Sequence, residues 1–428
     1  MFNTEVEPTT QPAPDGADQT RVRVLLLGSG ELERELTIAL QRLGAEVIAV
    51  DRYADAPAHG VADRSVVAKM TDPDALAAVV EREKPRFVVT ATDAVAFDAL
   101  AAAAESNGAE LAPSARSARL AMDREGMRRL AADELGLPTA PFWFAGSVDE
   151  LTAVAQHAGF PLVVKPVVAV PGQGESVLLR SGDIEPAWRR AVSAGGRITR
   201  NRVLAETVVE IDYEITLLTV RVMSPHGPVL HFCEPIGHRQ VDGEVLQSWQ
   251  PQEMDGAALD AAKSIAARIV NALGGCGVFG VELLVAGDEV YFTDLTVRPG
   301  DGGLVTLRTQ RLSEVELQAR AILGLAVDTI MISPGAAEVV YADHKSVRGH
   351  AARDDDSEPD LAGVLAEALA VPESEVRVFD HQGPQGWGGS EGYGRRRLGL
   401  ALATAPTLTT ARDRVRQMSA ALCKLGQP

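Results

Sequence analysis

Val278-Phe-Gly-Val-Glu282-Leu-Leu-Val-Ala-Gly-Asp-Glu-Val-Tyr-Phe-Thr-Asp294 is the stretch that decides the fold, because it carries two acids twelve positions apart. β-Branched and aromatic residues fill both halves, and Ala286–Glu289 has the composition of a turn, which predicts a β-hairpin. Closing that hairpin brings Glu282 and Asp294 roughly opposite each other. Two adjacent carboxylates raise each other's pKa unless a cation lies between them. Magnesium suits such a site, since it takes one or two protein carboxylates and completes its octahedron with phosphates and water.

An isolated acid pair is equally compatible with a solvated surface hairpin. The residues that follow, Thr296–Gly303, favour the functional interpretation because they are polar, rich in glycine and include the cation Arg298. A hairpin with inward acids that runs into such a loop is typical of the metal end of a nucleotide site.

Composition limits the class of protein. At 428 residues the chain is too long for a single core and fits two to four domains. The formal net charge of −18 argues against nucleic acid and against an anionic membrane surface as partners. No run reaches the roughly 18 apolar residues of a membrane span. Three widely spaced cysteines with no CxxC pair fit reduced thiols in a cytoplasmic protein.

The N-terminal part alternates apolar strands with helical patterns. Arg21–Leu27 and Glu46–Asp51 are expected to be buried strands, and the alternation continues through Phe87–Thr92 to about Leu111, which predicts a doubly wound parallel sheet. Residues 1–20 are polar and acidic, without the basic flank or apolar core of a signal peptide, and are expected to form a disordered tail.

The turn Gly28-Ser-Gly30 resembles a dinucleotide-binding fingerprint, but Glu33 occupies the position of the third glycine. Close packing of helix on strand needs glycine there, so NAD binding is disfavoured. We expect a loop that presents Glu31 to a small polar ligand instead.

A second unit begins near Asp123, a good N-cap for a helix over Arg124–Leu135. Lys165 ends a buried strand and either projects into a cleft toward phosphates or is a solvated strand end. Gly172-Gln-Gly174 either allows phosphate oxygens close to the backbone or forms an ordinary β-turn. Glu206 either faces an adenine edge or is a charge on an edge strand. The order of these features along the chain favours the functional interpretation of each one over its structural alternative.

That order resembles the ATP-grasp superfamily, whose members bind Mg-ATP between two α+β lobes and join a carboxylate to an amine through an acyl phosphate. Within it the chain is similar to the formate-dependent phosphoribosylglycinamide formyltransferase family of purine biosynthesis. The similar stretches run in order from about residue 21 to about residue 425 and include Leu27–Leu32, Glu46–Pro57, Arg124–Ala132, Glu214–Thr219, Pro235–Gln240, Ser248–Gln252 and Arg396–Ala403.

The resemblance implies a tail, a Rossmann-like pre-ATP-grasp domain, a two-lobed ATP-grasp domain and a small β-rich C-terminal domain, at residues 1–20, 21–120, 121–325 (small lobe about 124–208) and 326–428. It also implies functional residues for ATP, magnesium and 5'-phosphoribosylglycinamide. The ATP contacts are Arg124, Lys165, Val170, Pro171, Gly172, Gln173, Gly174, Glu175, Glu206, Thr207, Val208, Val209 and Glu214, and magnesium falls on Glu282 and Asp294. The substrate positions are Glu31, Leu32, Ala91, Asp301, His381, Arg396 and Arg397. Lys165, Asp301 and Asp93 are the candidate catalytic residues.

Consecutive arginines at 396 and 397 suit a ribose phosphate through bidentate guanidinium–phosphate bonds, although a basic surface run has the same pattern. The chain also departs from the family at five places. Gln173 replaces a lysine, Asp294 a glutamate, Ala91 a substrate-binding glutamate, His381 a substrate lysine, and Gly300 a histidine. Asp93 is a possible substitute for the acid missing at Ala91, unless it merely caps the following helix.

We therefore expect a cytoplasmic, homodimeric ligase that formylates 5'-phosphoribosylglycinamide with formate and ATP through formyl phosphate. One alternative is an ATP-grasp ligase for a different small carboxylate. Another is a nucleotide-binding regulator that has lost turnover, which Gln173 and Ala91 would favour. ATP hydrolysis that requires both formate and the ribonucleotide separates the three.

Overall fold

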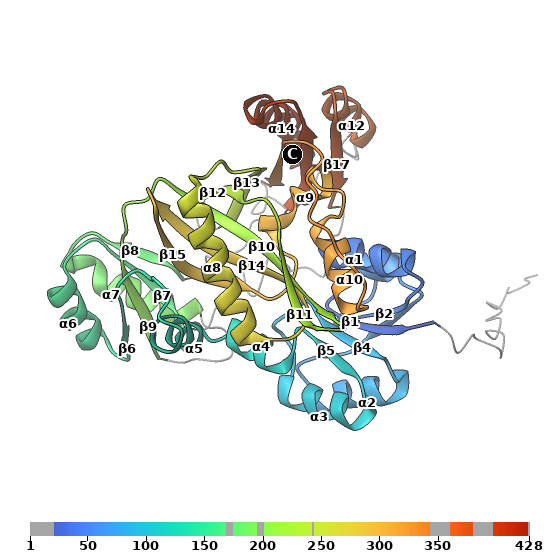
Figure 1. Cartoon of the computed structure of the whole chain (residues 1–428), viewed down its shortest axis with the longest axis horizontal. Coiled ribbons are helices and arrows are strands. Elements are labelled where there is room, and N and C mark those ends of the chain that lie inside the picture. The colour runs from blue at the N-terminus through green and yellow to red at the C-terminus, as the bar shows by residue number, and fades with distance from the viewer. Residues whose placement is uncertain are drawn as a thin grey trace, which may run out of the picture.

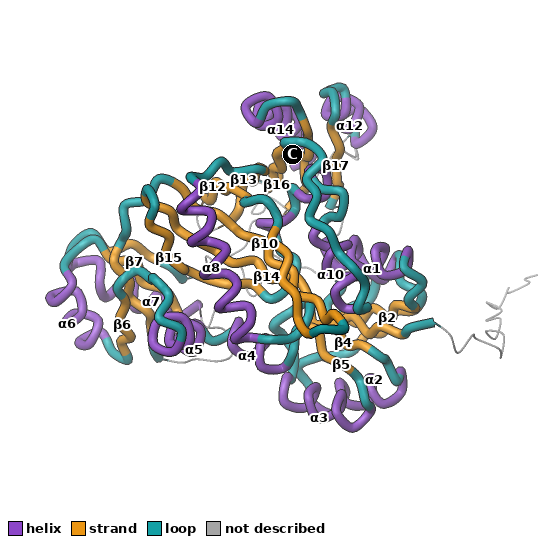
Figure 2. The backbone as a smooth tube through the Cα atoms, in the orientation of Figure 1, coloured by secondary structure: helices purple, strands orange, loops and turns teal. Residues whose placement is uncertain are grey.

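The structure is a computed structural model that describes residues 21–167, 174–194, 201–241, 244–342, 360–379 and 397–426. Its strands form three sheets, which carry the N-terminal unit, a small lobe and a large lobe extended by the C-terminal strands (Figures 1 and 2). None of the helices in the described part of the chain is long and apolar enough to cross a membrane.

The N-terminal sheet has five parallel strands in the order β3-β2-β1-β4-β5. Helix α1 packs on one face and helices α2 and α3 pack on the other, so the central strands are apolar on both sides. This confirms the doubly wound parallel sheet. The elements are β1 (Arg23–Leu27), α1 (Glu31–Arg42), β2 (Glu46–Asp51), β3 (Arg64–Val67), α2 (Pro73–Glu83), β4 (Phe87–Thr90), α3 (Phe97–Asn107) and β5 (Glu110–Ala112).

The small lobe is an antiparallel sheet in the order β6-β9-β7-β8, covered by two helices. Helix α5 leads into it and continues as a short π-helical turn, Leu130–Glu134. The elements are α4 (Ala115–Ala121), α5 (Arg124–Arg129), β6 (Phe142–Ala145), α6 (Val148–Ala158), β7 (Leu162–Pro166), β8 (Ser176–Leu178), α7 (Ile184–Ala194) and β9 (Val203–Thr207).

The large sheet has nine strands in the order β15-β14-β10-β12-β13-β16-β18-β17, with β11 paired to β10. The C-terminal unit is rich in strands, as expected, and continues this sheet through the pairing of β13 with β16. The elements are β10 (Tyr213–Ser224), β11 (Gly227–Phe232), β12 (Ile236–Val241), β13 (Glu244–Gln250), α8 (Gly256–Leu273), β14 (Gly277–Ala286), β15 (Glu289–Thr296), α9 (Thr306–Thr309), α10 (Glu314–Ile322), β16 (Gly335–Tyr341), α12 (Leu361–Leu369), β17 (Ser374–Val378), β18 (Arg397–Thr404) and α14 (Leu408–Leu422).

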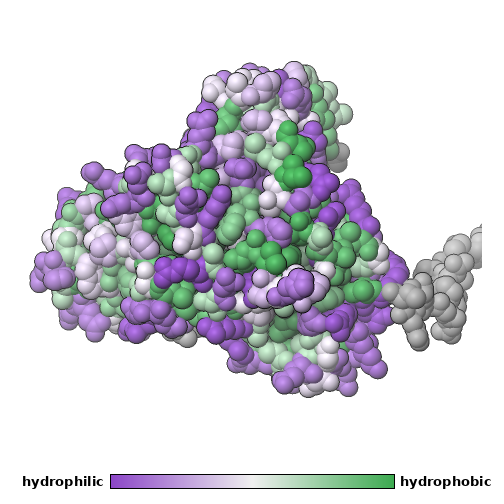
Figure 3. Space-filling model, viewed as in Figure 1, coloured by the Kyte–Doolittle hydropathy of each residue, from purple (hydrophilic) through white to green (hydrophobic). Residues whose placement is uncertain are grey.

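Two hydrophobic cores pack against the large sheet. Helix α8 packs on β10, β14 and β15 around Phe279 and Phe292, both nearly inaccessible to solvent. Helix α10 lies between the large sheet and α1, so it joins the N-terminal unit to the large lobe. The surface seen in Figure 3 is mostly hydrophilic at its edges, with hydrophobic residues gathered toward its centre.

Candidate functional site

The paired acids lie where the sequence predicts them. Strands β14 and β15 are joined by the two-residue turn Gly287-Asp288, in which Gly287 has φ +58°, a left-handed conformation that glycine adopts readily. Glu282 is the direct cross-strand neighbour of Asp294, and a register irregularity follows Glu282. The hairpin therefore holds the two carboxylates side by side, and Glu282 is half-buried, which disfavours the fully solvated hairpin.

The acid pair is electrostatically unfavourable when both carboxylates are ionised. Burial raises the pKa of Glu282 to about 8, and the nearby carboxylates of Asp294 and Glu214 add to this effect. Burial also raises the pKa of Glu214. A divalent cation placed between Glu282 and Asp294 would reverse this penalty, so the donor set fits magnesium.

Two cations face the acid pair from the small-lobe side. Arg124 donates from Nη2 to Glu175 Oε1 at 3.0 Å, and its Nε lies 3.7 Å from Asp294 Oδ2. Lys165 Nζ lies 3.1 Å from Glu206 Oε2. Burial opposes the charge on Lys165, yet Glu206 and Glu175 raise its pKa above the usual value. Lys165 is therefore a half-buried, charged lysine that is ion-paired with Glu206, and not the solvated strand end that was the alternative.

Glu206 is a buried residue of the inner strand β9, so the edge-strand interpretation of this acid is wrong. Burial would raise its pKa, but Lys165 and Arg128 lower it below the usual value. Arg128 makes an ion pair with Glu206 and also donates to the backbone oxygens of Phe292 and Thr293, each at 2.9 Å.

Arg128 was not predicted from the sequence as a site residue. The available signal was its spacing of four from Arg124, which places both guanidiniums on the same face of α5. Together these side chains line a pocket between the lobes, bounded by Arg124, Arg128, Lys165, Leu204, Phe292 and Asp294.

The chain leaves the small lobe beside this pocket. Thr207 ends β9, its N–H donates to Pro141 O at 3.0 Å, and Val208 is exposed. Gly174 has φ +74°, and a Cβ there would collide with Ala194 of α7, so a side chain is excluded. The other predicted ATP-loop residues, Val170, Pro171, Gly172 and Gln173, lie outside the described residues, as do the substrate candidates His381 and Arg396 and the predicted tail.

The second candidate region is the turn after β15. Asp301 begins a short 3-10 turn, Asp301–Gly303, and its carboxylate makes a two-bond ion pair with Arg397 at the start of β18. Glu31 begins α1, with Gly30 as the N-cap. The structure thus brings two of the predicted substrate residues, Asp301 and Arg397, into direct contact.

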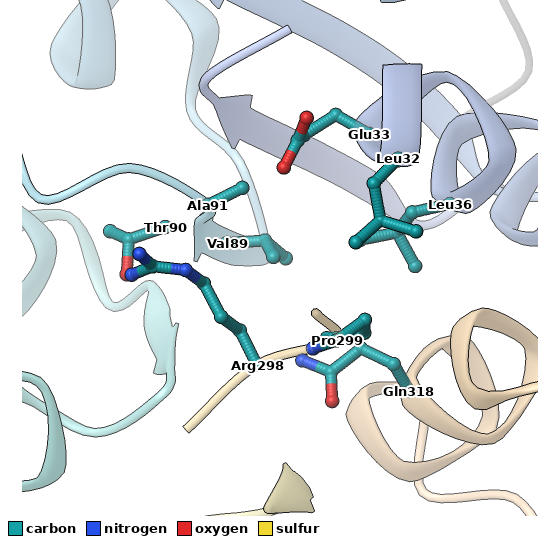
Figure 4. A pocket seen from close by; sticks show the side chains of 9 residues that line it. All are labelled: Leu32, Glu33, Leu36, Val89, Thr90, Ala91, Arg298, Pro299 and Gln318. Carbon is teal, nitrogen blue, oxygen red and sulfur yellow. The ribbon is translucent and has the colours of Figure 1, made fainter. Parts of the chain in front are cut away.

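A pocket lies between α1, the end of β4 and the loop after β15. Figure 4 shows Glu33, Ala91 and Arg298 converging on it, with Leu32 and Gln318 also in its wall. Burial raises the pKa of Glu33, whose carboxylate also accepts a hydrogen bond from the Gly30 N–H. Glu33 therefore stabilises the first turn of α1 where a dinucleotide fingerprint would have glycine.

Asp93 is not free in this structure. Arg298 donates to its two carboxylate oxygens at 2.7 and 3.1 Å. Strand β4 ends at Thr90, so Asp93 lies in the following loop and strand alternation does not relate it to Ala91. The alternative that Asp93 caps the next helix is wrong, because α3 begins at Phe97 with Ala96 as its N-cap and no side-chain cap bond.

Residues 22–122 match the ribonucleotide synthetase preATP-grasp domain, and residues 130–315 match the ATP-grasp domain. The formate-dependent phosphoribosylglycinamide formyltransferase of Rhodococcus jostii is 50% identical over 400 residues, covering 92% of this chain and 93% of that protein. The chain belongs to the formate-dependent phosphoribosylglycinamide formyltransferase family. Its members are ATP-grasp enzymes of purine biosynthesis.

Two further matches support this membership in the formate-dependent formyltransferase family. The formyltransferase of the same name from Burkholderia mallei is 50% identical over 404 residues, covering 94% of this chain and 95% of that protein. The structure of glycinamide-RNase-transformylase T from Mycobacterium tuberculosis has 53% sequence identity and a TM-score of 0.75, covering 93% of this chain and 99% of that one. A carboxyaminoimidazole ribonucleotide synthase from Aspergillus clavatus has a TM-score of 0.76 at 20% identity, which shows a shared fold only.

Asp93→Asn tests the acceptor side of this formyltransferase site. The change removes the charge that Arg298 neutralises and any proton-accepting role toward the substrate amine. We expect turnover with 5'-phosphoribosylglycinamide to fall strongly, while formate-dependent ADP formation without the ribonucleotide stays at its wild-type background. Steady-state kinetics measure both. Asp98→Asn, which removes an exposed acid paired with Arg119, is the control, and full activity of the Asp93 variant would reject a role for Asp93 in turnover.

Proposed function

We propose that this protein formylates 5'-phosphoribosylglycinamide with formate and ATP, through formyl phosphate, in purine biosynthesis. The observation that carries the proposal is the cross-strand pair Glu282–Asp294, with Lys165 and Arg124 near it at the pocket between the lobes. This arrangement suits the terminal phosphates of ATP, because it offers carboxylates for a metal ion and fixed cations for phosphate oxygens. Membership in the formyltransferase family supports the choice of formate and ribonucleotide.

Different residues would bind ATP and the ribonucleotide, at the two ends of the site. Lys165 and Arg124 would hold ATP phosphate oxygens, and Glu206 through Val209 would hold the adenine at the link between the lobes. Formate would attack the γ-phosphate, giving formyl phosphate and ADP. The amine of the ribonucleotide would then attack the formyl carbon and release phosphate, with Asp301 and Arg397 positioning the ribonucleotide. Formyl phosphate hydrolyses readily, so the site must exclude water during both steps.

Magnesium would bind Glu282 and Asp294. In the part of the chain that the structure describes, no group of three or more His, Cys, Asp or Glu side chains is placed to hold a metal. The protein would supply these two carboxylates, while phosphates and water would complete the shell, as is usual for magnesium. Bound there, the ion would offset the negative charge of the transferring phosphoryl group.

The decisive experiment measures ADP release with ATP and magnesium while each substrate is omitted in turn. We expect ADP formation to require formate and 5'-phosphoribosylglycinamide together, and mass spectrometry to detect the formylated ribonucleotide. Turnover with bicarbonate or another carboxylate in place of formate would favour a different ATP-grasp ligase. ATP binding by calorimetry without turnover on any acceptor would favour a nucleotide-binding regulator.

A homodimer and a cytoplasmic location remain predictions from the resemblance. Analytical ultracentrifugation of the full chain measures the first directly. Fluorescence microscopy of a tagged chain measures the second.

A further inference from the structure

The turn that carries Asp301 rests on a buried acid, Glu314, the first residue of α10. The Gly300 N–H donates to Glu314 Oε2 at 3.1 Å, and the N–H of Glu314 itself donates to Thr306 Oγ1 at 2.9 Å. A Cβ at Gly303 would collide with the Glu314 carboxyl group. Glu314 is therefore packed directly beneath the turn and bonded to it, with 0% of the residue exposed.

The same turn is enclosed from the side. A Cβ at Gly302 would lie 3.2 Å from both His238 Cε1 and Thr216 Oγ1, and His238 Nε2 is hydrogen-bonded to Thr216 Oγ1 at 2.7 Å. On the open side, Asp301 meets Arg397. The turn is therefore tightly packed below and beside, and Glu314 is bonded to Gly300, the residue directly before Asp301.

No described residue neutralises a negative charge on Glu314. Its second oxygen, Oε1, is buried without a hydrogen-bond partner, and the described residues form no ion pair with its carboxyl group. Asp301 and Cys233 are the titratable groups that interact with it electrostatically, and neither one stabilises a negative charge. A buried carboxylate without a cation is very unfavourable, whereas a neutral acid costs only its unmet hydrogen bond. Burial accordingly raises the pKa of Glu314 well above its usual value.

The charged groups around α10 do not change this conclusion. Asp301 on the turn is neutralised by Arg397 of β18, and His238 of β12 faces Gly302 and Thr216. Burial lowers the pKa of His238 to about 4, so it is neutral near pH 7. On the α1 side, Arg42 lies 3.9 Å from Glu316, two residues further along α10.

We propose that Glu314 is a positioning residue of the formyltransferase, held as a neutral carboxylic acid, that fixes the Gly300–Gly303 turn so that Asp301 and Arg397 meet the ribonucleotide in the reactive geometry. This inference rests on the proposed function, because it assigns Asp301 and Arg397 to the acceptor side of that reaction. A buried neutral acid suits the role, since its carbonyl oxygen accepts from Gly300 while no charge disturbs the Asp301–Arg397 pair.

The test compares Glu314→Gln, Glu314→Asp and Gly303→Ala in the full-length protein. Glutamine keeps the length and the acceptor oxygen without a charge, so activity close to wild type is expected from about pH 6 to pH 9. Aspartate is one methylene shorter and cannot reach Gly300 without moving the turn. Since a misplacement of about 1 Å can cost on the order of 10²-fold, kcat/KM for the ribonucleotide should fall about 10- to 100-fold. Gly303→Ala should act likewise, and both should leave the KM for ATP unchanged.

Glu316→Gln is the matched control, because it removes a carboxylate from the same helix but keeps an acceptor for the Ser313 capping box. Thermal unfolding of each variant shows whether it is folded. If Glu314→Asp does not fold, Gly303→Ala still tests the positioning role, since it displaces the turn while Glu314 stays intact.

Loss of activity in Glu314→Gln as large as in Glu314→Asp would overturn the neutral-acid assignment. Equal losses for ATP and the ribonucleotide would make the role merely structural, and a wild-type protein with no ribonucleotide-dependent ADP release would instead refute the proposed function.

Discussion

Replacing Glu282 with glutamine is expected to abolish formylation and, at the same time, to stabilise the ligand-free protein. Glutamine nearly preserves the shape of the side chain but cannot ionise opposite Asp294, its cross-strand neighbour. The carboxylate proposed to bind magnesium is then lost, and stabilisation of a transferring phosphoryl group by a bound metal is worth several kcal/mol. Turnover should therefore fall by at least about 10³-fold.

The stability effect follows from the direction of the pKa shift. In the unfolded chain Glu282 ionises near its usual value of 4.5, whereas in the folded, ligand-free protein it keeps its proton up to about pH 8. Above pH 4.5 the folded state thus binds more protons than the unfolded state, and the free energy of unfolding falls as pH rises toward 8. Glutamine does not titrate, so the stability gained by the variant should be absent near pH 4 and grow until about pH 8.

Thermal unfolding across this pH range, without nucleotide or magnesium, measures the gain. Asp288→Asn is the control, because it removes an exposed acid from the turn of the same hairpin and should change neither turnover nor the pH dependence. Retained turnover in Glu282→Gln at saturating magnesium would contradict the metal assignment. A stability gain that does not depend on pH would contradict the electrostatic explanation.

The hairpin could be predicted from sequence because every signal for it is local. Alternating β-branched residues and a Gly-Asp turn predict the hairpin, whereas the direct pairing of Glu282 with Asp294 also depends on the register irregularity that follows Glu282. The parallel N-terminal sheet was predictable for the same reason, since its strands are apolar runs separated by helices of ordinary length.

The charge pairs between distant segments could not be predicted in this way. Arg128 meets Glu206 across 78 residues of sequence, and Arg298 meets Asp93 across 205. Neither pair has a periodic signature, because their contacts depend on how the lobes and the N-terminal unit pack together. The alternative that Asp93 caps a helix was wrong for a local reason, because helix α3 begins only at Phe97, several residues after Asp93.

Arg397→Ala is expected to impair use of the ribonucleotide while leaving ATP binding intact. Arg397 lies at the start of β18 with 44% of its side chain exposed, so its guanidinium can bind both Asp301 and a phosphate group from solvent. Charge-assisted hydrogen bonds contribute about 1.5–3 kcal/mol each, and a factor of ten corresponds to about 1.4 kcal/mol. The loss of one such bond should therefore lower kcat/KM for the ribonucleotide about 10- to 100-fold.

Lysine at position 397 distinguishes phosphate recognition from simple charge. A point charge cannot form the paired bonds of a planar guanidinium, so Arg397→Lys should recover only part of the lost affinity for the ribonucleotide. Arg416→Ala, which removes an exposed arginine paired with Asp413 in the same C-terminal unit, should have no effect on either substrate.

Isothermal titration calorimetry with ATP and with the ribonucleotide distinguishes a phosphate-binding role of Arg397 from a structural one. If Arg397→Ala weakens ATP and the ribonucleotide equally, Arg397 serves to hold β18 and the Asp301 turn together and does not bind the phosphate. If only the ribonucleotide is weakened, and replacing Arg396 as well weakens it further, the two consecutive arginines act as a phosphate-binding pair on an otherwise acidic protein.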